Sequence, residues 1–341
     1  MTTPKIPLNT FAIPLGLAGL GEVWTVLGSE HHAPALVGDV IMLIAAAAWV
    51  ATEAAYLSYL ITTAAPAGKT FSADFLDPTG SPFGSPAVIV PVALASDGLY
   101  PHAAASGRVI TDVFIALTVL LGGWFTGQWI YGPLDLDRFH PGYFLPTVAG
   151  GLIAAEGAAL VGQRRLAEVL LGFGVMSWVV IGSLILGRLF FRPLLPPPLQ
   201  PTMAIEVAPA AVSTAAWFAI HGRSIDPVTA FLAGYGMLMV LAQLRLLPAY
   251  LRLKFMPTFW AFTFSWAAVV GSAILWLQST QPTGYRSWQY VLAAALTAFI
   301  GAIAIRTVIA LSRHQYLPRP PAAAPDAGSA GTARPASAAT P

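Results

Sequence analysis

Five acidic residues lie inside or near long apolar stretches of the chain: Glu22, Asp39, Glu53, Glu156 and Glu206. An ionisable group in hydrocarbon costs about 2.5 to 3.5 kcal/mol even on lenient insertion scales, so each acid is a candidate functional residue. Glu22, Asp39 and Glu206 lie near the ends of their stretches, where we expect them to reach the membrane interface. Glu53 and Glu156 lie deeper, and two roles are open for them: pairing with an arginine of a neighbouring helix or subunit, or accepting protons in a coupled transporter.

A second candidate is an aromatic residue in the stretch KFMPTFWAFTFSWAAVVGSAILWLQ, which runs from Lys254 to Gln278. At about 100° per residue, four of its rings share one helical face: Phe255, Phe259, Phe262 and Trp266. Phe264 lies roughly opposite Phe262, on a face of alanine, serine and glycine. Two interpretations are open: Phe264 fills a gap where helices approach closely, or it plugs a pore.

No residue pattern in the chain predicts an enzyme, a metal site or a bound cofactor. Cysteine is absent, which excludes thiolate catalysis and iron–sulfur ligation. The six histidines are scattered, and none forms the paired helical spacing of a zinc enzyme. Walker, nucleophile-elbow and dinucleotide patterns do not occur. We therefore predict that the protein is not an enzyme and uses no cofactor.

The composition predicts an integral membrane protein whose surroundings are the lipid bilayer. Only 9% of the residues are charged, against about 25% in soluble domains. The mean hydropathy is +0.70. A net charge of +2, spread along the chain, predicts no nucleic-acid partner.

Ten apolar stretches are predicted to cross the bilayer, which takes about 20 apolar residues per helix; the third of them is short. They are residues 7–27, 37–62, 84–99, 109–131, 144–161, 167–189, 203–220, 227–246, 254–278 and 288–311. A polar loop is expected around Lys69, Asp74 and Asp77. Residues 1–312 are predicted to form one transmembrane channel domain, and residues 313–341, rich in alanine and proline, a disordered cytoplasmic tail.

Proline alternates along these stretches. The odd-numbered ones carry proline with glycine or alanine nearby, whereas the even-numbered ones are bulkier and largely free of internal proline. Proline kinks a helix and frees a carbonyl that protein or water must satisfy, so kinked helices belong inside. We predict five helical hairpins that place five kinked helices in an inner ring around a central pore. The residues expected to line it are Pro14, Gly16, Pro91, Pro146, Ala149, Gly150, Pro209, Ala211, Phe262 and Ala268.

The positions of lysine and arginine predict the orientation. With the N-terminus inside, the outer loops hold five of the 17 basic residues: Arg108, Arg164, Arg165, Arg223 and Arg286. The other twelve (17 minus five) lie at the inner ends and loops. Basic residues favour the cytoplasmic side, so both termini are expected in the cytoplasm.

Four motifs in this order resemble one family: PLNTFAIPLGLAGLGEVW, HPGYFLPTVAGGLIAA, PTMAIEVAPAAVS and KFMPTFWAFTFSW. It is the family of TehA tellurite-resistance proteins, plant slow anion channels and C4-dicarboxylate transporters. The resemblance covers all ten stretches and implies ten helices in five hairpins around a pore, usually as a homotrimer. It also implies a phenylalanine gate in the ninth helix within a W-x-[FY]-[ST]-F pattern, matched here by Trp260, Phe262, Thr263 and Phe264.

The leading functional prediction is an anion channel of the inner membrane, occluded by Phe264. Its partners would be small inorganic or organic anions, attracted by Arg245, Arg252 and Lys254 at the cytoplasmic mouth. The alternative is a proton-coupled secondary transporter of C4-dicarboxylates or a related oxyanion, with Glu53 or Glu156 as the proton site. A carboxylate in the conduction path repels anions and so favours the alternative.

Overall fold

The computed structural model describes residues 5–29, 33–63, 66–132 and 134–318. All regular elements in these ranges are helical, and ten spans are long and apolar enough to cross a membrane, which confirms the predicted class. The spans are Leu8–Ser29, Ala35–Thr62, Ser81–Leu99, Ala104–Tyr131, Pro141–Leu160, Arg164–Phe191, Pro197–His221, Pro227–Tyr250, Pro257–Thr280 and Tyr285–Ser312. The predicted tail lies outside the described residues from position 319 onward.

The even-numbered spans are uninterrupted α-helices. They are α2 (Ala35–Thr62), α5 (Ala104–Tyr131), α7 (Arg164–Phe191), α9 (Pro227–Tyr250) and α11 (Tyr285–Ser312). Few of their residues are buried: between 17% and 39% of each apolar window. Large aliphatic and aromatic side chains face outward instead, as they do on helices that contact lipid.

The odd-numbered spans are irregular helices. Their α-helical parts are α1 (Ala12–Ser29), α4 (Pro86–Ala93), α6 (Gly150–Leu160), α8 (Ala208–His221) and α10 (Trp260–Thr280). Each begins with a 3₁₀ segment, and the third and fifth spans also contain π-helical segments at Leu94–Leu99 and Leu145–Ala149. Pro91 and Pro146 lie just before and within these π segments, and proline, which has no N–H to donate, disturbs the α-helical bonding there.

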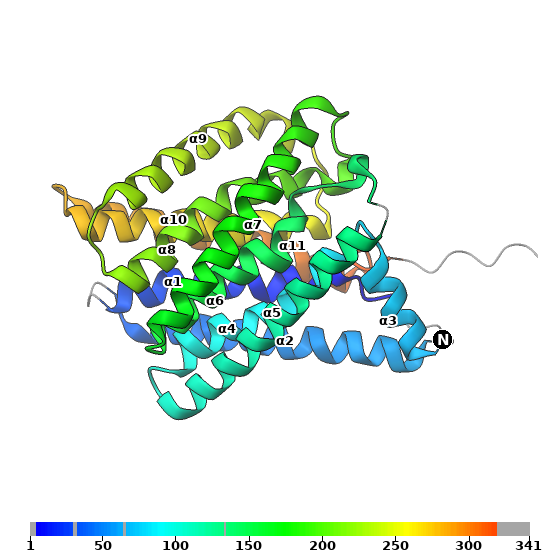
Figure 1. The fold of residues 1–341 in the computed structure, drawn as a ribbon, viewed down its shortest axis with the longest axis horizontal. Coiled ribbons are helices and arrows are strands. Elements are labelled where there is room, and N and C mark those ends of the chain that lie inside the picture. Colours follow the sequence, from blue (N-terminus) through cyan, green and yellow to red (C-terminus); the bar gives the residue numbers. More distant parts are fainter. Residues whose placement is uncertain (1–4, 30–32, 64–65, 133, 319–341) are drawn as a thin grey trace, which may run out of the picture.

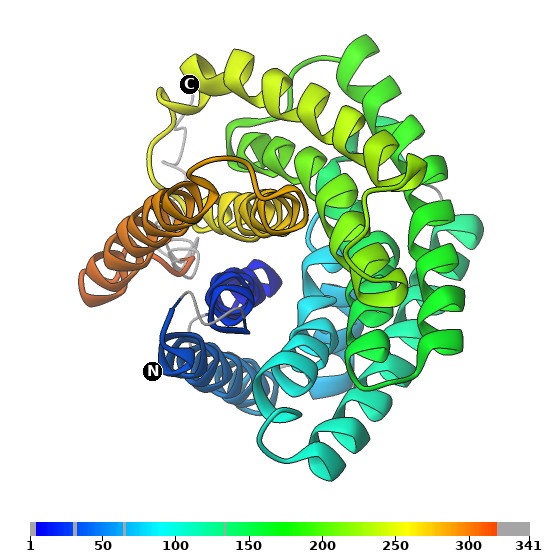
Figure 2. The ribbon, with the colours of Figure 1, turned by 90° about the vertical axis from the view of Figure 1, so that its left-hand side faces the viewer.

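Burial separates the two kinds of span. Between 56% and 89% of each odd-numbered window is buried. The α-helices of these spans also contact one another in a closed order: α1 with α4, α4 with α6, α6 with α8, α8 with α10, and α10 with α1. Figures 1 and 2 show the even-numbered helices around this group. This packing order is the one that a ring of five hairpins requires, while a conducting pore stays a prediction.

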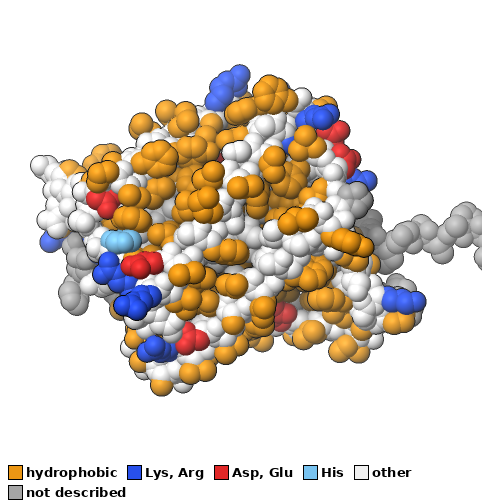
Figure 3. All heavy atoms as spheres, viewed as in Figure 1, with side chains coloured by type: hydrophobic (Ala, Val, Ile, Leu, Met, Phe, Trp, Pro, Cys, Tyr) orange, Lys and Arg blue, Asp and Glu red, His pale blue; other side chains and the backbone are white. Residues whose placement is uncertain are grey.

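The surface follows the same division. On the face in Figure 3, hydrophobic side chains cover the middle of the molecule, and most charged side chains lie toward its two ends.

The prediction of a polar loop after the second span is wrong in one respect. Residues Ala67–Leu76 form a short helix, α3, whose Asp74 is buried and pairs with Lys5 at 2.8 Å.

A histidine joins the ends of two inner spans. His140, immediately before the fifth span, is fully buried; its Nε2 donates to the Thr79 carbonyl at 3.0 Å, and the Gly142 N–H donates to its Nδ1 at 3.1 Å. Its ring stacks on Phe83 with centroids 5.5 Å apart. Burial lowers the pKa of His140 to about 4. The neutral ring therefore fixes the third span to the fifth.

Candidate functional site

A small cavity lies at the centre of the inner helices. It is lined by residues of α1, α6, α8 and α10, namely Gly19, Glu22, Ile153, Glu156, Ala211, Val212, Ala215, Phe264 and Ala268. Its free volume is ≈ 10 Å³. One water molecule needs about 10 to 15 Å³ measured in this way, so the site as it stands holds at most a single water.

Phe264 is buried at the edge of this cavity. Its side chain is 8% exposed, and its Cδ2 lies 3.5 Å from where a Cβ on Gly19 would be placed. That Cβ would also lie 3.0 Å from the Cβ of Ala267. Glycine at position 19 thus lets α1 approach α10 closely beside the Phe264 ring.

Two carboxylates line the same cavity. Glu22 on α1 and Glu156 on α6 both face it, although the sequence predicted that Glu22 would reach the membrane interface. Asp97, in the π segment of the third span, is close enough to interact electrostatically with both. Within the described part of the chain, neither Glu22 nor Glu156 has a hydrogen bond or an ion pair with a basic residue. The site therefore brings the Phe264 ring together with two acids that have no basic partner among the described residues.

Asp97 is not among the acids that the sequence pattern singled out. Asp97 lies only two residues before the end of the third span, a position from which an acidic side chain ordinarily reaches solvent. The Ser96 hydroxyl donates to Asp97 Oδ2 at 2.9 Å. The π-helical turn that carries Asp97 is the available signal, because such turns often occur at functional sites, but it is a feature of the backbone and not of the residue pattern.

The residues predicted to line the pore fall into two groups. Ala211 and Ala268 line the cavity, together with Phe264, which was predicted as the gate, and Glu156, which was predicted as a proton or ion-pair site. The others do not line it. A Cβ on Gly16 would overlap the Thr263 side chain, and one on Gly150 would lie 2.9 Å from Thr118, so these glycines serve helix packing.

The remaining predicted residues lie elsewhere. Pro14, Pro91, Pro146, Ala149 and Pro209 are buried within their helices. Phe262 lines a groove on the outer side of α10, together with the three other rings that periodicity placed on its face.

Two further acids lie away from the cavity. Glu53 is half-buried on the outer helix α2. Glu206 is 4% exposed in the 3₁₀ segment of the seventh span, and neither of its carboxylate oxygens has a partner among the residues the structure describes. No group of three or more metal-ligating side chains occurs in the described ranges.

These features define a class: an all-helical, multi-pass membrane protein. The particular family follows from comparison with known proteins. Residues 5–308 match the family described as voltage-dependent anion channel, and the chain belongs to that family. It is also similar to the tellurite resistance protein TehA homolog of Haemophilus influenzae, with 26% identity over 317 residues that cover 91% of this chain and 92% of the relative. The family resemblance inferred from the four motifs is thereby confirmed.

Proposed function

We propose that the protein is an anion channel in which Phe264 occludes a path between the five inner helices. Membership in a family of channels and transporters supports the transport of anions. The observation that supports the gate is the cavity of ≈ 10 Å³ that Phe264 lines together with Gly19, Ala211 and Ala268. No dehydrated anion larger than a water molecule fits through such a constriction while the ring is in place.

Opening requires more than a rotation of the ring. A rotamer change is inexpensive only where free space receives the side chain, and the cavity offers almost none. The ring must therefore move together with a neighbouring helix. Gly19 on α1 and Ala211 on α8 lie at the two contacts where such a movement would release it.

The test compares two phenylalanines on one helix. Phe264 and Phe262 are 8% and 7% exposed, but Phe262 faces the outer groove. We expect Phe264→Ala to raise chloride or nitrate current at least tenfold at equal protein density in planar bilayers. Phe262→Ala should leave the current near the wild-type level, although it removes a ring of the same size. Equal currents from both variants would show that Phe264 is only a packing residue.

A second candidate function is a proton-coupled carrier of C4-dicarboxylates or a related oxyanion such as tellurite. The positions of Glu22 and Glu156 beside Phe264 favour it, because ionised carboxylates in the path repel an anion and protonated ones do not. Proton uptake at these acids would then accompany anion entry. Glu53, on an outer helix, is the weaker of the two proton sites proposed from the sequence.

Glu156→Gln separates the two functions. If the protein is a carrier, the Glu156→Gln variant should no longer accumulate labelled malate against a gradient in proteoliposomes with an imposed pH difference. A channel should keep pH-insensitive current. Glu168→Gln is the matched control, since Glu168 is exposed on α7 and pairs with Arg164 at 3.2 Å.

The setting of the protein is part of the proposal. We place it in the inner membrane with both termini in the cytoplasm, on the distribution of lysine and arginine. Residues 1–312 would form the channel domain, a homotrimer would carry one path per subunit, and residues 313–341 would remain outside the bilayer. Arg245, Arg252 and Lys254, all exposed, would draw anions to the cytoplasmic mouth.

A further inference from the structure

An apolar groove lies on the outer side of α10, between α9 and α11. Its volume is ≈ 620 Å³, within the range of about 300 to 1,000 Å³ of pockets that enclose small molecules. Phe262 and Trp266 of α10, with Phe259 immediately before this helix, form its floor, and Leu247 of α9 and Phe299 of α11 form part of its walls. Along α11 it extends from Leu292 to Arg306, which is about 21 Å at ~1.5 Å per residue. One leaflet of a bilayer, half of roughly 30 Å, is shorter than this groove.

The groove is apolar along its length except at the end marked by Arg306. Two other polar residues line it, Gln243 and Tyr250, but their groups are already bonded within the protein. The Tyr250 hydroxyl donates to Gln243 Oε1 at 2.7 Å, and Gln243 Nε2 donates to the Met203 carbonyl at 2.9 Å. Across the described ranges, by contrast, Arg306 has neither an ion pair nor a hydrogen bond. Its guanidinium is therefore the only free charged donor that lines this groove within the described residues.

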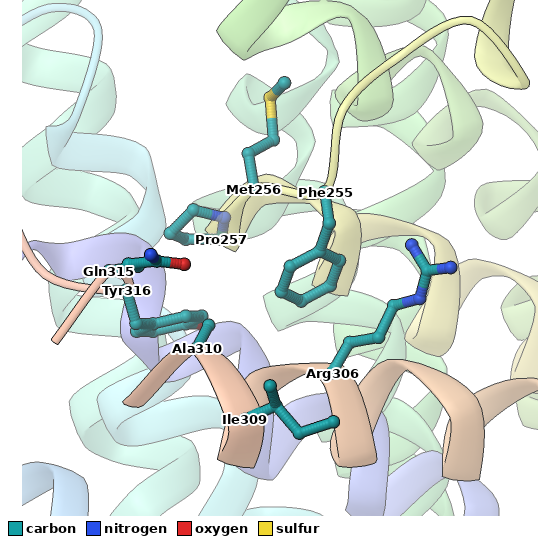
Figure 4. Close-up of a pocket in the computed structure, with 8 residues that line it drawn as sticks. All are labelled: Phe255, Met256, Pro257, Arg306, Ile309, Ala310, Gln315 and Tyr316. Carbon is teal, nitrogen blue, oxygen red and sulfur yellow. The ribbon is translucent and has the colours of Figure 1, made fainter. Parts of the chain in front are cut away.

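A second pocket of ≈ 260 Å³ continues from the same end. Phe255 and Arg306 line both spaces. Figure 4 shows Arg306 rising from α11 on one side of the Phe255 ring, with Gln315 and Tyr316 on the other side. Tyr316 is buried, and its hydroxyl has no hydrogen-bond partner among the described residues. This pocket is thus more polar than the groove, since Arg306, Gln315 and Tyr316 line it.

We infer that the two spaces together bind one anionic phospholipid. An acyl chain occupies the groove against the rings of α10, and the phosphate lies at Arg306 in the polar pocket. Guanidinium groups suit phosphate because their planar donors bond two oxygens at once. Basic sites between membrane helices are a recognised setting for anionic headgroups.

Charge rather than apolar burial should decide which lipid binds. The bilayer interior is as apolar as the groove, so moving an acyl chain from one to the other changes the hydrophobic free energy little. Every phospholipid brings a similar chain, whereas only an anionic one leaves Arg306 with a net counter-charge. Arg252 and Lys254, in the connection between α9 and α10 next to Phe255, add to the positive potential at this end.

The test uses native mass spectrometry of the full-length protein in detergent, titrated with phosphatidylglycerol or phosphatidylcholine of identical chains. We expect one phosphatidylglycerol to be retained per subunit in preference to phosphatidylcholine. Arg306→Gln should weaken phosphatidylglycerol binding about tenfold, as expected for the loss of a charge-assisted pair, and leave phosphatidylcholine unchanged. Arg313→Gln is the control for general surface charge, because Arg313 is exposed at the end of α11 and lines neither space.

A second pair of variants tests the groove itself. Ala302 lines it, whereas Ala298, also exposed on α11, does not. Ala302→Trp should abolish retention of both lipids, and Ala298→Trp should not; both should elute as the wild type does in size exclusion. Equal retention of the two lipids by the wild type, or equal losses in Arg306→Gln and Arg313→Gln, would overturn the inference. A change of subunit stoichiometry in Ala302→Trp with unaltered lipid binding would instead show that a second copy of the chain occupies the groove.

Discussion

Acidification should destabilise the fold through His140. The neutral ring donates from Nε2 to the Thr79 carbonyl and accepts from the Gly142 N–H at Nδ1. Protonation at Nδ1 removes that acceptor and places a charge in a site where the side chain is 0% exposed. Burial holds the pKa of His140 at about 4 in the folded protein, against 6.5 for an ordinary histidine. The unfolded chain therefore binds one more proton than the folded chain between these two values.

The direction and size of the change in the free energy of unfolding follow from this difference in proton binding. Above about pH 6.5 the histidine is neutral in both states and has no effect. As the pH falls from 6.5 toward 4, the free energy of unfolding decreases by about 1.4 kcal/mol per pH unit, and it changes no further below the folded-state pKa. At about pH 5.0 the loss amounts to about 2 kcal/mol, and it approaches about 3 kcal/mol near pH 4.

The assay is unfolding of the detergent-solubilised protein, followed by tryptophan fluorescence at about pH 7.5 and about pH 5.0. His140→Asn cannot take up this proton, so the part of the pH dependence that belongs to His140 should disappear, although the variant is less stable at neutral pH. His221→Asn, at an exposed position, should retain the wild-type dependence. The reasoning is refuted if His140→Asn and the wild type lose the same stability on acidification.

Two further predictions concern packing and buried charge. Gly16→Ala should lower the free energy of unfolding by about 1 to 3 kcal/mol, because its methyl group would overlap Thr263 and press on Trp260. Gly172→Ala, which meets no atom within 4 Å, should instead raise it by about 0.5 to 1 kcal/mol, and denaturant unfolding of the two variants measures the difference. Glu206→Met should raise it by about 1 to 3 kcal/mol, since it removes a buried carboxylate without a partner in the described chain. A lower thermal midpoint for Glu206→Met would show that the carboxylate has a stabilising partner.

The sequence predicted the membrane spans well because hydrocarbon imposes a simple rule. Every backbone group must be satisfied within the span, so helices and apolar length go together. The alternation of proline also indicated which spans are buried, since freed carbonyls need protein or water around them. Helical periodicity placed four aromatic side chains on one face of this span, and all four line one groove: Phe255, Phe259, Phe262 and Trp266.

The site was less predictable, because it depends on how separate helices are offset along their axes. Glu22 was expected at an interface from its distance to the end of one stretch, yet α1 sits so that this residue is level with Phe264 of α10. Asp97 was overlooked for the same reason. Helix α3 was missed because its ten residues are too few and too polar to stand out by the length and apolarity that mark a membrane span.

The first inner helix, α1, is bonded to the last two helices of the chain. Trp24 donates to Thr297 of α11 at 3.0 Å, and Gln278 of α10 donates to the Val26 carbonyl at 3.4 Å, across 273 and 252 residues of sequence. During translation the face of α1 that packs on α10 and α11 therefore has no such partner until nearly all the spans have been made. The glycine-rich side of α1 reaches its final packing only when the last two spans are in place.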